Sequence, residues 1–147
     1  MSLKEKFPSD LKDSLKSGDR LKVSVIRLVM AALKNKEIEK RGPLSDDEVI
    51  DVLVSLSKQR RESIECFEKG GRQDLVDKET AELKIVESYL PEQLTPEEVK
   101  EKIREAIAET GASGARDIGK VMKTLMPKVK GRADGKLVNE MVRELLG

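Results

Sequence analysis

The chain has 147 residues, which is enough for one domain of ordinary size or for two small ones. Its 29 Lys and Arg residues nearly balance its 28 Asp and Glu residues, so a basic surface must be local, and the 2% aromatic content disfavours a β-sandwich or a base-stacking platform. The chain has no His and a single cysteine, Cys66, which excludes His-dependent catalysis, His-containing zinc sites and an intramolecular disulfide.

Ala, Glu, Lys, Leu and Arg make up about half of the residues, which is typical of long helices. In the first part of the chain, Leu11 and Leu15 lie four residues apart and Gly18 supplies a stop. Ser45 and Glu48 form a capping box that starts another helix. These patterns predict four helices, at residues 9–17, 19–41, 45–69 and 72–90.

Two prolines, Pro91 and Pro96, interrupt the helical pattern and predict a linker at residues 91–96. Thr95 and Glu98 form a second capping box, with Pro96 at the first helical position. Three further helices are expected, of which the second breaks at Pro127. The sequence thus predicts an all-α protein, with an N-terminal helical bundle at residues 1–90 and a small three-helix domain at residues 97–147.

The charges are unevenly distributed along the chain. Residues 1–42 carry 11 basic and 6 acidic side chains, residues 43–91 carry 7 and 12, residues 92–115 carry 3 and 6, and residues 116–147 carry 8 and 4. The two ends are therefore basic and the middle is acidic, which indicates a charged partner. The alternative is a chance fluctuation in a highly charged helical protein.

The basic run near the C-terminus is the most informative feature. Six cations fall within 17 residues with only Asp134 opposing them, and phosphate oxygens are their natural partner. Glycines in the same run would let the backbone approach a phosphate closely. The predicted nucleic-acid-binding residues are Lys120, Lys123, Lys128, Lys130, Arg132 and Lys136, with close backbone approach at Gly131 and Gly135. The alternative is a solvated charged face, which is also how we interpret the run Arg20, Lys22, Arg27, Lys34 and Lys36.

Other candidate sites have simpler structural explanations. The acids Asp46 to Glu48 belong in the first turn of a capped helix, and Gly70 and Gly71 are typical of a helix-to-helix turn. Cys66 has no His to activate it. We therefore expect no catalytic residue, no metal and no cofactor in this chain.

Segments that enter or cross membranes have a characteristic apolar length. The longest apolar stretch, residues 28–33, is far shorter than the roughly 20 residues of a membrane span. The N-terminus lacks an apolar signal core. The sequence thus predicts a cytoplasmic protein without membrane contact.

Six stretches in the same order resemble the GatB/YqeY family, in the form of a free-standing YqeY-like member. They are Arg27–Asn35, Ile38–Arg41, Gly71–Leu75, Tyr89–Leu94, Gly119–Met122 and Met126–Gly135. The resemblance covers nearly the whole chain and implies an all-helical fold with a larger N-terminal bundle and a three-helix C-terminal part. The family label is carbon–nitrogen ligase with glutamine as amide donor.

The resemblance also implies a link to tRNA. A similar module forms the C-terminal tail of the B subunit of the tRNA-dependent amidotransferase, where it contacts the tRNA near its elbow. Residues 95–147 would be its counterpart, with the match carried by Gly119–Met122 and by the loop Lys130–Gly135. Lys123 departs from free-standing members, which often have Gly there, and agrees with the amidotransferase tail. The catalytic part of the B subunit and the glutamine-hydrolysing subunit have no counterpart here.

Three functions remain open at this point. The first is a non-catalytic accessory protein that binds tRNA or another structured RNA. The second is a component that acts only beside amidotransferase subunits, and the third is a helical adaptor whose acidic middle meets a basic protein. The basic run at residues 116–136 favours the first function.

Overall fold

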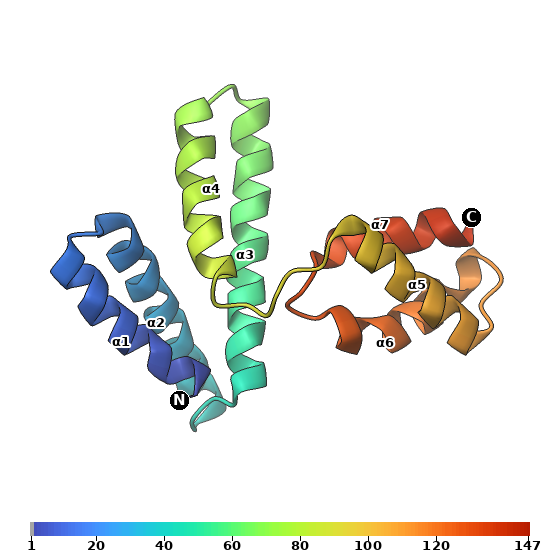
Figure 1. Ribbon diagram of the computed structural model, residues 1–147, viewed down its shortest axis with the longest axis horizontal. Helices are drawn as coiled ribbons and strands as arrows, with labels where there is room; N and C mark the ends of the chain where they lie inside the picture. The colour runs from blue at the N-terminus through green and yellow to red at the C-terminus, as the bar shows by residue number, and fades with distance from the viewer. Residues whose placement is uncertain (1) are drawn as a thin grey trace. The chain divides into compact units, whose positions relative to one another are not determined.

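The computed structural model describes residues 2–147, and every regular element in this range is helical, which confirms the predicted all-α fold (Figure 1). The helices fall into two compact units that divide between Leu90 and Pro91. A short 3₁₀ helix, η1 (Ala115–Asp117), precedes α6. The α-helices are α1 (Leu3–Ser17), α2 (Arg20–Lys40), α3 (Asp46–Lys69), α4 (Gln73–Glu87), α5 (Pro96–Thr110), α6 (Ile118–Val129) and α7 (Gly135–Leu146).

The first helix begins at Leu3, earlier than the predicted residue 9. Ser2 is its N-cap, and the Glu5 carboxylate accepts the Ser2 backbone N–H at 3.1 Å. Pro8 lies inside this helix, where its ring removes only one backbone donor. The Asp46 carboxylate also accepts the Leu3 N–H at 3.2 Å, so a local cap and a contact from α3 together satisfy backbone donors at the start of α1.

The first unit consists of two helical hairpins, α1 with α2 and α3 with α4 (Figure 1). The Tyr89 ring, just after α4, lies 4.5 Å from the Phe7 ring, and the Tyr89 hydroxyl donates to the Asp10 carboxylate. This contact ties the end of α4 to α1. The buried core contains Phe7, Val25, Ile26, Val29, Leu33, Leu44, Val49, Leu53, Leu56 and Val86.

The pairing of α3 with α4 includes a polar section. Arg60 of α3 is only 7% exposed, and its Nε lies 3.6 Å from Glu82 Oε2 of α4. The neighbouring Ser57 hydroxyl is buried, and within residues 2–147 it has no hydrogen-bond partner. A buried charge needs an opposite charge close by, so Glu82 offsets part of the free-energy cost of burying Arg60 between the two helices.

The second unit consists of α5, α6 and α7. Its α5 begins at the predicted capping box, in which Thr95 Oγ1 accepts the Glu98 N–H at 3.2 Å. Contrary to the predicted break at Pro127, α6 continues to Val129, which is completely buried. Burial of that last turn offsets the donor that Pro127 lacks. The buried core contains Val99, Ile103, Ala106, Val121, Leu125, Val129, Val138, Met141 and Val142.

Within residues 2–147, every helix is either too short or too polar to cross a membrane.

Candidate nucleic-acid interface

A short hydrogen-bonded turn at residues 113–117 precedes α6. The Asp117 carboxylate accepts the backbone N–H of Ser113 at 3.0 Å, and this hydrogen bond lowers the pKa of Asp117. The positive charges of Lys120 and Arg116 lower that pKa further. The carboxylate therefore stays ionised and holds the loop against the first turn of α6.

The charged side chains within α6 are all basic. The helix presents Val121, Leu125 and Val129 to the core and has no acidic residue along its length. Lys120 and Lys123 lie three positions apart on the opposite side, and both are exposed. In the described part of the chain, Lys123 makes no ion pair or hydrogen bond. The two lysines therefore form one local cationic face, which we call the α6 face.

Lys128 does not join the α6 face. It lies about 140° around the helix from Lys123, and it is more than two turns beyond Lys120 along the helix axis. Its Nζ lies 3.1 Å from Glu109 Oε1 of α5, so its charge is already paired. The helix geometry thus separates two lysines that lie close in the sequence.

The turn after α6 holds the segment that precedes α5. Gly131 has a φ of 74° and is buried, and its carbonyl accepts the Gln93 side-chain amide at 2.7 Å. The Arg132 carbonyl accepts the Leu94 N–H at 2.8 Å, while Arg132 Nε donates to the Glu92 carbonyl at 3.1 Å. The carbonyls of Gly131 and Arg132 and the Arg132 guanidinium are therefore already hydrogen-bonded to residues 92–94.

The first residues of α7 lie at the other side of this turn. Asp134 caps the helix by accepting the Lys136 N–H at 3.3 Å. A Cβ added to Gly135 would meet no atom within 4 Å, so no neighbouring atom crowds that side of the residue. Lys130 and Lys136 are both exposed. The predicted site residues are thus distributed over the α6 face, the α5 side of α6 and the turn before α7.

Sequence reasoning missed the hydrogen bonds from residues 92–94 to the turn. Two of them involve backbone atoms of Gly131 and Arg132, and backbone acceptors leave no signature in composition or spacing. No signal in the sequence could have found them. It also missed the pairing of Lys128 with Glu109, although the position of Lys128 on the helical wheel, away from Lys123, was available.

Residues 4–146 match the family model described as "Yqey-like protein". A curated relative from Eremothecium gossypii, "Altered inheritance of mitochondria protein 41, mitochondrial", is 43% identical over 82 residues, which cover 55% of this chain and 45% of the relative. Relatives with the same name are 30% identical in Pyrenophora tritici-repentis, over 97% of this chain and 80% of the relative, and 32% identical in Saccharomyces cerevisiae, over 94% and 65%. The match thus spans less than half the length of the first of these relatives.

These names correct the predicted cytoplasmic location, which is wrong because the relatives are named as mitochondrial proteins. The prediction depended on the lack of an apolar signal core. That criterion does not detect mitochondrial targeting segments, which are amphipathic and rich in Arg and Ser. The names state no reaction or substrate. The family match over nearly the whole chain, together with the all-α fold, shows that this protein belongs to the YqeY-like family.

Proposed function

We propose that the protein is a non-catalytic accessory protein that binds structured RNA, and that tRNA is the RNA to test first. The observation that carries this proposal is the α6 face, where Lys120 and Lys123 project together from a helix without an acidic residue. The motif resemblance to the tail of the amidotransferase B subunit supports tRNA as the ligand. The names of the relatives support mitochondria as the compartment in which to look for it.

Phosphate contact is the chemistry that this surface offers. Two lysines on adjacent turns of α6 can each neutralise one phosphate and release its counterions. Lys136 and Gly135 lie in the same unit and can add contacts at the start of α7. With 2% aromatic residues the chain has little capacity for base stacking. The proposed binding is therefore directed by shape and charge rather than by sequence.

The test is a titration of total tRNA against the full chain, followed by fluorescence anisotropy at low salt. Lys120→Glu/Lys123→Glu should weaken binding about tenfold or more, because it replaces two phosphate contacts by two repulsions. The matched control is Lys58→Glu/Lys78→Glu, which makes the same charge change at exposed positions of α3 and α4. Circular dichroism verifies that both variants stay folded.

Salt dependence distinguishes phosphate binding from other contacts. If about three phosphates are contacted, the log–log slope of affinity against salt should lie at roughly −2 to −3, and it should become shallower in the α6 variant. No binding by the unmodified chain at low salt would reject the proposal. Equal losses in the α6 variant and in the control would also reject it, because binding would then follow net charge alone.

A further inference from the structure

The seam between α1 and α2 is hollowed on its exposed side. One hollow of about 700 Å³ is lined by Lys4 and Pro8 of α1 and by Met30, Ala31, Lys34 and Ile38 of α2. A second hollow of about 480 Å³ lies against Leu15 of α1 and Arg20 and Arg27 of α2. Both hollows lie between the same pair of helices, and we call the two together the α1–α2 groove.

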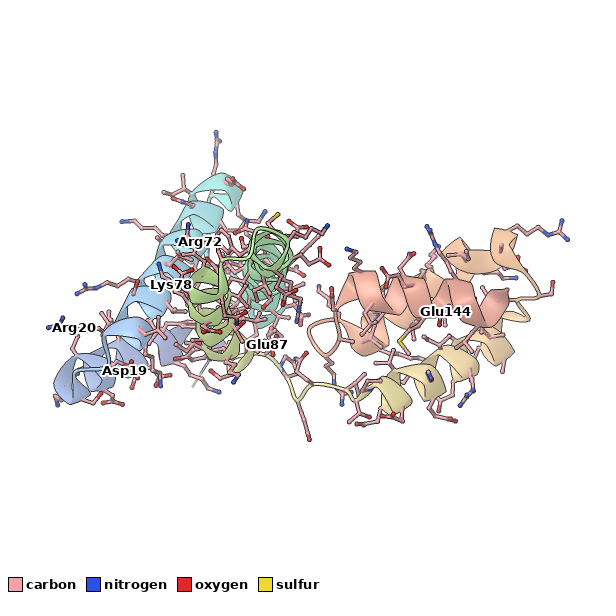
Figure 2. The ribbon with its side chains drawn as sticks, turned by 90° about the horizontal axis from the view of Figure 1, so that it is seen from above. Asp19, Arg20, Arg72, Lys78, Glu87 and Glu144 are labelled. Carbon is pink, nitrogen blue, oxygen red and sulfur yellow. The ribbon has the colours of Figure 1, made fainter. Side chains whose placement is uncertain are left out.

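Three cations border this groove at a regular interval. The cations are Arg20, Arg27 and Lys34, which follow one another at intervals of seven residues. Consecutive members are therefore about 10 Å apart along α2 and differ by only about 20° around the helix axis. All three are exposed and make no ion pair or hydrogen bond within the described residues. Figure 2 shows the Arg20 side chain pointing away from the start of α2. Lys4, by contrast, is paired with Glu37 at 2.8 Å.

Small and apolar side chains alternate with these cations. Ser24, Ala31 and Ile38 each follow a cation by four residues. These three residues and the three cations form a stripe along α2, in which consecutive members are alternately four and three residues apart. This period of 3.5 is the one at which a second helix stays in contact with a first along its length. Ile38 is 66% exposed and Leu15 is 53% exposed, although both are large apolar side chains. The stripe therefore has the spacing, the charge and the uncovered apolar surface of a helix-docking seam.

We propose that the α1–α2 groove binds an acidic amphipathic helix of a partner protein. Such a helix presents carboxylates every seven residues to Arg20, Arg27 and Lys34, and places its apolar side chains against Ile38 and Leu15. Charge complementarity selects this partner, since three unpaired cations in a row repel a basic helix. Nucleic acid is less suited, because the apolar lining has no partner in a sugar–phosphate backbone and no lining residue is aromatic.

This site is separate from the proposed RNA surface. The groove belongs to the first unit, while the α6 face belongs to the second. Substitutions in α2 test the helix-binding proposal and substitutions in α6 test the RNA proposal, so either can fail without the other.

The probe is a synthetic helical peptide of about 21 residues, or six turns, with Leu at heptad seam positions and Glu at every seventh position beside them. Its binding to the full chain is measured by fluorescence anisotropy. We expect Arg27→Glu/Lys34→Glu and, separately, Ile38→Ser each to weaken binding about tenfold, while Lys58→Glu/Lys78→Glu leaves it unchanged. All of these positions except Ile38 carry exposed charges, so the folded state should tolerate the changes, which circular dichroism checks.

A charge exchange gives the sharpest result. A peptide with Lys in place of the three Glu should bind the Arg27→Glu/Lys34→Glu variant better than it binds the unmodified chain. Absence of binding by the Glu peptide would overturn the proposal, and so would equal binding of a peptide whose Leu residues are changed to Ser. Two other results would assign the groove to a different occupant and overturn it too: tRNA binding that the α2 variant abolishes, or self-association of the chain that the same variant abolishes.

Discussion

Arg132 Nε donates a hydrogen bond to the backbone carbonyl of Glu92 at 3.1 Å, across 40 residues of chain. The same residue accepts the Leu94 N–H at 2.8 Å through its own carbonyl. An arginine that sequence analysis assigns to RNA binding thus also holds the segment before α5 against the turn before α7. Its structural contribution can be measured independently of any ligand.

Replacing Arg132 by Ala should loosen this segment locally. The substitution removes the side-chain hydrogen bond to Glu92 and keeps the backbone carbonyl, so about 1 kcal/mol of local stability is lost and the Leu94 amide exchanges about fivefold faster. Hydrogen exchange followed by NMR measures this rate. Lys123→Ala, at an exposed position of α6, serves as the control and should leave the rate unchanged. An unaltered Leu94 rate in the Arg132 variant would show that the backbone contacts hold the segment alone.

The pairing of Lys128 with Glu109 makes a prediction that depends on the proposed function. Replacing Glu109 by Gln removes one negative charge and frees Lys128 to contact phosphate outside the α6 face, so tRNA affinity should rise about two- to fivefold at low salt. The same titration as for the α6 variants measures it. Glu101→Gln, on the same helix, is the matched control. A fall in tRNA affinity in the Glu109→Gln variant would contradict the proposal that Lys128 can contribute to RNA binding.

Glu48 should titrate far below an ordinary glutamate. Its hydrogen bond from Lys40 and the backbone N–H of Ser45 lower its pKa to about 2. Because the folded pKa lies below the unfolded value of about 4.5, the stability that Glu48 contributes is present above pH 4.5 and is lost as the pH falls toward 2. NMR titration of the Glu48 side chain measures the midpoint. Lys40→Ala should raise it, and an unchanged midpoint would assign the shift to the capping box alone.

The Arg60–Glu82 pair predicts non-additive stability changes. Glu82→Ala leaves the Arg60 charge buried without its partner and should cost about 2–4 kcal/mol in the free energy of unfolding. Arg60→Met/Glu82→Leu removes both charges and fills their volume, so it should cost less than the single change. Urea unfolding followed by circular dichroism compares the two. A double variant less stable than Glu82→Ala would show that the ion pair is a net stabilising contact.

Helix positions could be predicted largely from the sequence alone, because a helix starts and ends through contacts within one turn. The boxes Ser45–Glu48 and Thr95–Glu98 cap α3 and α5 as predicted, and Gly111 ends α5 with a φ of 66°. The same local chemistry determined the all-α class. The predicted helix end at Pro127 was wrong, because tertiary burial of Val129 keeps the last turn of α6 helical.

Only the tertiary structure decided which residues make up the α6 face and the α1–α2 groove. Lys123 and Lys128 lie in one basic run of the sequence, yet packing of α5 beside α6 brings Glu109 to Lys128 and leaves Lys123 without an ion pair among the described residues. Likewise, Arg20, Arg27 and Lys34 read as a solvated helix face until α1 supplies the second wall of the groove. The sequence determines the type and the order of side chains. Which of them meet across helices depends on non-local contacts that apolar packing selects, and these have no signature in local spacing.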